Sequence, residues 1–108
     1  MEEFRVTIRI AGNTRIPALA SIRKKGYRVE HSALAIDGDI GNCASQWDAI
    51  KDDYLFSATT PEELLGLIAM WDTRGDDWRA KAEDFAFADE VDESMVIYDE
   101  EGNVINEE

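Results

Sequence analysis

Cysteine, histidine and proline are scarce in this chain of 108 residues, which has one Cys, one His and two Pro. The single cysteine, Cys43, excludes an internal disulfide and fits a reducing compartment. Long hydrophobic runs are absent too, because the longest, residues 64–71, is far shorter than a membrane span. The start, MEEFRVTIRI, lacks the cationic and apolar regions of a signal peptide. We therefore expect a soluble cytoplasmic protein with no membrane contact.

Catalytic and metal-binding signatures are equally sparse. His31 and Cys43 do not define a catalytic dyad, because no characteristic sequence frame surrounds either residue. Asp37, Asp39 and Asp48 have some spacing of a calcium loop, but Asn42 stands where that loop needs glycine. Carboxylates are paired in many turns, so no pair is marked as a general acid and base. The sequence predicts no catalytic residue, no metal site and no cofactor.

Positive charge is scarce and unevenly distributed. The chain has 11 Lys and Arg against 24 Asp and Glu, a net charge of −13. Residues 1–36 carry +4 (seven cations, three anions), residues 37–75 carry −6 (two and eight), and residues 76–108 carry −11 (two and thirteen). Such a field repels nucleic acid and attracts basic proteins. It favours a basic protein partner over nucleic acid, with solubility alone as the simpler explanation.

The first half of the chain predicts a strand, a helix and three more strands. Apolar residues alternate with polar ones from Phe4 to Ile10, which is typical of a half-buried strand. Residues 14–25 predict a helix that Thr14 caps and Gly26 ends. Residues 27–36 predict a strand, and after a loop beginning DGDIGN, residues 46–58 predict a hairpin with the polar turn KDD.

The clearest local signal is TPEE at Thr60–Glu63. Thr60 is the expected N-cap, Pro61 suits the first helical position, and Glu63 completes a capping box. The helix should end at Gly75, and Asp76 or Asp77 should cap a second, weaker helix.

The three tryptophans predict different environments. Trp71 is in phase with the apolar stripe of the helix, and Trp78 begins the stripe of the next segment, so both are expected mainly in the core. Trp47 follows a glycine-containing loop on a hairpin strand, and the sequence leaves open whether it lies in the core or at a partly exposed rim.

The end of the chain predicts a second hairpin, with strand 95–98, turn 99–103 and a return strand at 104–105. The resulting order is β-α-β-β-β-α-α-β-β. It predicts an α+β fold with an antiparallel or mixed sheet of about five to six strands and two or three helices on one face. Residues 1–108 are expected to form a single globular domain whose last three residues are frayed.

The acidic block of residues 83–101 is the most distinctive feature of the sequence. It mixes carboxylates with aromatic and aliphatic residues, unlike a disordered acidic tail. A rigid negative surface with an aromatic anchor suits a basic protein. The predicted partner-binding residues are Asp89, Glu90, Asp92, Glu93, Tyr98, Asp99 and, separately, Trp47.

Three classes of function follow from these features. The first is a binding module that docks a basic protein, in its sharpest form an inhibitor or immunity-type protein. Small size, acidity and the α+β order make the chain similar to many toxin-neutralising and anti-defence proteins. The second is a small enzyme or ligand-binding domain, which requires a concave pocket. The third is an accessory subunit of an oligomer, including a homo-oligomer paired through edge strands such as 4–10 or 95–98.

Overall fold

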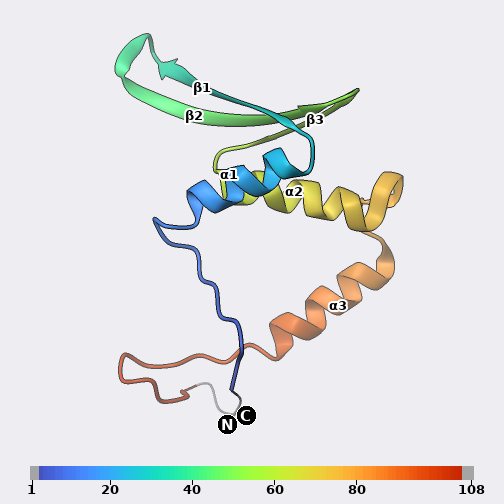
Figure 1. Cartoon of the computed structure of the whole chain (residues 1–108). Helices are drawn as coiled ribbons and strands as arrows, with labels where there is room; N and C mark the ends of the chain where they lie inside the picture. The colour runs from blue at the N-terminus through green and yellow to red at the C-terminus, as the bar shows by residue number, and fades with distance from the viewer. Residues whose placement is uncertain (1–2, 106–108) are drawn as a thin grey trace. The chain divides into compact units, whose positions relative to one another are not determined.

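The computed structural model describes residues 3–105 and contains a small antiparallel sheet with helices (Figure 1). Its elements are α1 (Arg15–Lys24), β1 (Arg28–Ile36), β2 (Asp39–Lys51), β3 (Tyr54–Ala58), α2 (Pro61–Arg74), a 3₁₀ turn (Gly75–Asp77) and α3 (Ala82–Glu93). Residues up to Asp76 form one compact unit, and residues from Asp77 form a second. The fold is α+β with an antiparallel sheet. The single-domain expectation stays a prediction.

The sheet has the order β1-β2-β3, and α1 and α2 lie on one of its faces (Figure 1). The register places His31 opposite Trp47 and Val29 opposite Ala49. Because side chains alternate along a strand, these four residues point to the same face. Trp47 and Ala49 are buried there, against the two helices. β1 is an edge strand, since within residues 3–105 only β2 pairs with it.

The core lies in the first unit and is built around three fully buried aliphatic side chains. Ile22 of α1 and Leu64 and Ile68 of α2 have 0% exposure. They pack with Tyr27, Trp47 and Ala49. The core is small, so each of these side chains contributes a large part of the buried apolar surface.

The predicted N-cap of α2 is confirmed. The Glu63 backbone N–H donates to Thr60 Oγ1 at 3.1 Å, and Pro61 occupies the first helical position. Hydrogen bonds from Thr59 and Thr60 hold the pKa of Glu63 below its ordinary value. Gly75, with a φ of 61°, follows the last helical residue as predicted.

The helix at 15–24 is confirmed, but its predicted cap is not. The Thr14 side chain makes no capping hydrogen bond to α1. Instead, Thr14 Oγ1 lies 2.6 Å from Glu62 Oε2 and so links the start of α1 to the first turn of α2. Gly26, with a φ of 95°, turns the chain from the end of α1 toward β1.

The predicted number and order of strands are wrong at both ends. Residues 3–13 form no strand, and Phe4, Val6, Ile8 and Ile10 are 57–79% exposed. The C-terminal hairpin is reduced to one bridge between Tyr98 and Val104. Alternation specifies a strand only where neighbouring strands supply hydrogen bonds. Among the described residues, 3–13 pair with no strand, and the C-terminal hairpin has no third strand beside it.

The last helix begins later than predicted. Asp76 and Asp77 belong to the 3₁₀ turn, and α3 starts at Ala82 with Lys81 as its N-cap residue. The Lys81 backbone N–H donates to Asp84 Oδ2 at 2.8 Å, which closes the first turn. Asp77 instead pairs with the Lys81 ammonium.

The three tryptophans differ in burial, and the prediction that Trp78 lies mainly in the core is wrong. Trp47 is only 7% exposed, so it is a core residue and not a rim residue. Trp78 is 38% exposed, with the Arg79 guanidinium 4.4 Å from its ring centroid. Trp71 is half-buried and its ring contacts Tyr54 at a centroid distance of 5.3 Å. Trp47 is buried because α1 and α2 cover its face of the sheet, an arrangement that local sequence does not encode.

Candidate functional site

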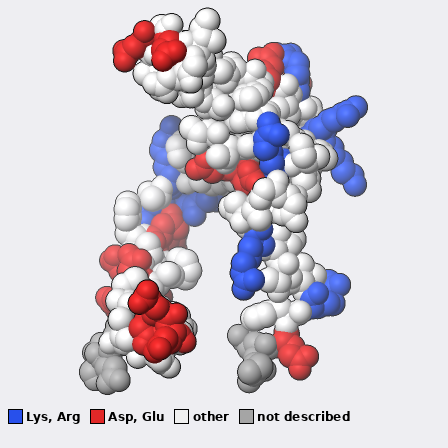
Figure 2. All heavy atoms as spheres, turned by 90° about the vertical axis from the view of Figure 1, so that its left-hand side faces the viewer, with Lys and Arg blue, Asp and Glu red and all other residues white. Residues whose placement is uncertain are grey.

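The acidic helix α3 is the main feature of the second unit. From Asp77 to Ile105 no residue is buried, and only Asp84 and Asp99 are half-buried. Phe85, Phe87 and Val91 of α3 are each more than half exposed. Figure 2 shows acidic side chains gathered on the surface of this unit. The helix therefore exposes both carboxylates and apolar side chains to solvent.

Four predicted binding residues lie at the C-terminal end of α3. Asp89, Glu90, Asp92 and Glu93 are all exposed. At 3.6 residues per turn they cover an arc of about 160°, and Phe87 and Val91 lie outside this arc. The structure therefore brings these four carboxylates onto one side of the helix.

The position of these four carboxylates is unfavourable in an isolated helix. The C-terminal end of a helix favours cations, and each carboxylate there costs about 0.3–1 kcal/mol. The last turn of α3 has no basic residue, and Asp89 and Glu93 are like charges four residues apart. Local helix stability thus does not account for this cluster.

Tyr98 and Asp99 belong to the turn that follows α3. Asp99 Oδ1 accepts the backbone N–H groups of Glu101 at 2.9 Å and Asn103 at 2.8 Å. Hydrogen bonding from the Asn103 backbone is the main cause that holds the pKa of Asp99 below its ordinary value. Asp99 therefore fixes the turn, whereas Tyr98 is 60% exposed beside it.

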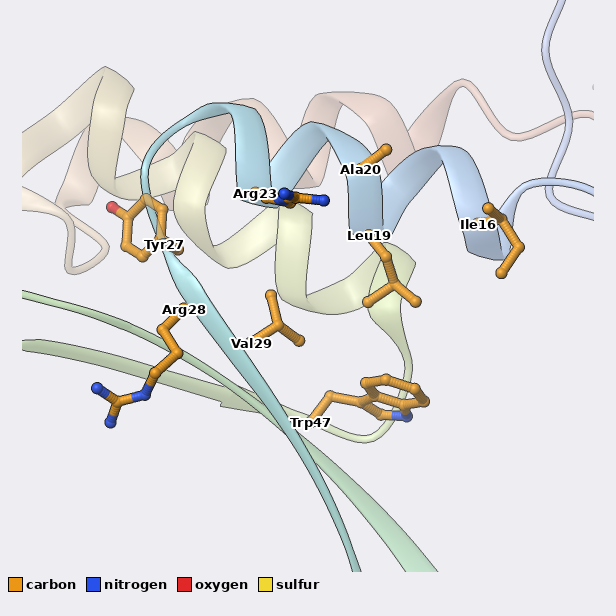
Figure 3. A pocket seen from close by; sticks show the side chains of 8 residues that line it. All are labelled: Ile16, Leu19, Ala20, Arg23, Tyr27, Arg28, Val29 and Trp47. Carbon is orange, nitrogen blue, oxygen red and sulfur yellow. The ribbon is translucent and has the colours of Figure 1, made fainter.

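A first groove lies in the other unit, between α1 and the edge strand β1 (Figure 3). Its volume is about 450 Å³. Ile16 and Leu19 of α1, Val29 of β1 and Trp47 of β2 form its apolar walls, and Arg23 and Arg28 also line it. Ile16, an apolar residue in the first turn of α1, is 63% exposed.

A second groove in this unit has a volume of about 330 Å³. His31 stacks on Trp47 with ring centroids 3.7 Å apart, and the Arg15 guanidinium lies 4.8 Å from the Trp47 ring centroid. Ser45 and Thr60 also line this groove. Trp47 thus contributes to both grooves despite its burial.

The candidate catalytic and calcium residues do not converge. Cys43 pairs with Ala35 of β1, whereas His31 lies four residues earlier, about 13 Å along the strand. Asp39 and Asp48 lie at opposite ends of β2, about 30 Å apart. Across the described part of the chain, no group of three or more His, Cys, Asp or Glu residues could hold a metal ion.

Sequence reasoning missed the groove between α1 and β1. The signal available in the sequence was the set of basic residues near both ends of helix 15–24. The groove itself depends on which strand lies at the sheet edge, and this order is a long-range property.

Comparisons with protein-family models, with curated proteins and with solved structures found no match for this chain. Between residues 3 and 105, no helix is both long enough and apolar enough to cross a membrane.

Proposed function

We propose that the chain is a protein-binding module that docks a basic protein through α3 and the turn that follows it. The carboxylates of Asp89, Glu90, Asp92 and Glu93 attract the partner, and Tyr98 provides an aromatic anchor. Asp99 holds the turn that carries Tyr98. An inhibitor or immunity-type protein that covers the binding site of a basic enzyme is the sharpest form of this proposal.

One observation carries the proposal: carboxylates cluster at the helix end where they destabilise α3. A cationic partner would reduce the repulsion between these carboxylates and the C-terminal end of the helix. Binding would therefore stabilise α3. The exposed Phe87 and Val91 support the same view, because apolar surface beside charge is typical of interaction sites. Trp47 stays a predicted contact residue, although it belongs to the grooves of the first unit.

The proposal is tested by capturing partners from a lysate of the organism that encodes the protein. Three immobilised proteins are compared at about 50 mM and about 500 mM salt. They are the wild type, the variant Asp89→Asn, Glu90→Gln, Asp92→Asn, Glu93→Gln, and a control with Asp37, Asp39, Asp52 and Asp53 changed to Asn. Both variants lose four negative charges, and Asn tolerates the positive φ of positions 37 and 52.

We expect one basic protein to bind the wild type and the control at low salt and to be lost from the α3 variant. A further variant, Tyr98→Ala, should raise the dissociation rate of that protein. Equal retention by the two neutralised variants would show that the negative charge acts only on solubility.

A further inference from the structure

We infer that the groove between α1 and β1 binds an acidic, extended peptide segment of a partner protein, which adds to the edge of the sheet. This site has the opposite charge to the acidic α3 surface and uses different residues. It therefore goes beyond the proposed function and does not depend on it.

The edge strand provides the backbone half of the site. β1 has nine residues, and no other strand within residues 3–105 pairs with its outer edge. Natural proteins often protect such an edge with a bulge. The only irregularity of β1 lies between Ala35 and Ile36, far from the groove. The stretch Arg28–His31 is regular and can accept an added strand.

The apolar walls provide the pockets for side chains. Val29 points toward the helices, while Arg28 and Glu30 point to the other face by strand alternation. A peptide beside β1 would direct every second side chain between Val29 and the helix residues Ile16 and Leu19 (Figure 3). The exposure of Ile16 would fall on binding.

The charge of the lining selects the occupant. Two arginines, Arg23 and Arg28, line the groove, and no carboxylate does. Arg28 points to the other face of the sheet and its Nε lies 3.2 Å from Glu30 Oε2, whereas no described carboxylate forms an ion pair with Arg23. Arg23 is therefore the cation that the groove offers to a ligand, and a peptide that carries Asp or Glu beside apolar residues matches both the walls and Arg23.

The chain's own residues 4–10 fit this site less well. They have the alternation of a strand, but Arg5 and Arg9 would bring further positive charge to a basic groove. Nucleic acid is disfavoured because the walls of the groove are apolar and only two arginines line it, whereas a nucleic-acid site needs several cations along the phosphate backbone.

The test is selection of peptides by the full chain from a displayed random library of about ten residues in length. We expect the selected peptides to share Asp or Glu together with apolar residues two positions apart. Their amide chemical-shift changes should fall on Arg28–His31 and on α1. No enrichment, or shift changes confined to other elements, would overturn the inference.

Two matched pairs of variants locate the site. Arg23→Glu should weaken binding of the selected peptides by about tenfold or more, whereas Lys24→Glu, outside the groove lining, should not. Ile16→Glu should also weaken binding, whereas Leu34→Glu, at a site of similar exposure, should not. Circular dichroism checks that each variant is folded. Equal affinity within both pairs would contradict the site, as would competition by a single-stranded oligonucleotide that binds more tightly than the peptides.

Discussion

At the scale of single residues, the stability of the first unit depends on a few side chains. Leu64 of α2 is fully buried in the core with Ile22 of α1 and Trp47 of the sheet. Leu64→Ala should therefore lower the free energy of unfolding by about 2–5 kcal/mol. Leu55→Ala is the matched control, because Leu55 is 63% exposed and its truncation should change stability by about 0.5 kcal/mol or less. Urea denaturation measures both values, and similar losses for the two variants would contradict the assigned core.

Thr60 is a second residue whose contribution can be measured directly. Its hydroxyl accepts the Glu63 N–H, so Thr60→Ala should cost about 1 kcal/mol. Thr60→Ser retains the acceptor and serves as the control. An unchanged unfolding midpoint for Thr60→Ala would show that this capping bond does not stabilise α2 in solution.

Asp99 gives the turn after α3 a defined pH dependence. Its folded pKa is lowered, so the charged carboxylate stabilises the turn above the ordinary Asp pKa. That stability is lost as the pH falls through the lowered pKa. The amide resonances of Glu101 and Asn103, which donate to Asp99, should therefore shift only at a pH below the ordinary Asp range. In Asp99→Asn this acid transition should be absent. A transition of the wild type at the ordinary Asp pKa would contradict the hydrogen bonds assigned to Asp99.

At the scale of elements, α3 should respond to charge in opposite ways at its two ends. Changing Asp89 to Asn together with Glu93 to Gln should slow hydrogen exchange of α3 amides about two- to fivefold, because the C-terminal end disfavours anions. Glu83→Gln, in the first turn, should speed exchange instead. If both substitutions changed the exchange rate in the same direction, the carboxylates at the C-terminal end of α3 would not destabilise the helix, and the proposed function would lose its main support.

The elements also show what sequence can and cannot predict. Helix 61–74 was predictable because Thr60, Pro61, Glu63 and Gly75 specify its ends through local contacts. The absence of a strand at 4–10 was not predictable, because strand formation requires a neighbour and the local pattern does not show whether one is present.

For the candidate site, the acidic cluster of α3 was predictable from composition and helix period alone. The burial of Trp47 and the groove beside β1 were not, because both depend on how separated segments pack.

At the scale of the whole molecule, charge is divided along the chain. Residues 1–36 carry +4 and residues 76–108 carry −11, by the counts of Lys, Arg, Asp and Glu. The first unit contains the buried core, whereas no described residue of the second unit is buried. The two binding surfaces that we propose, on α3 and beside β1, have the opposite charges that this division provides.

The most direct test of the central claim is the association rate of the captured partner with the chain, measured by stopped flow between about 50 mM and about 500 mM salt. The account predicts that the rate falls by more than about tenfold over this range, because opposite charges steer the encounter. The α3 variant should associate slowly at low salt, while the control variant should behave like the wild type. An association rate that is independent of salt, or the same in both variants, would contradict docking through α3.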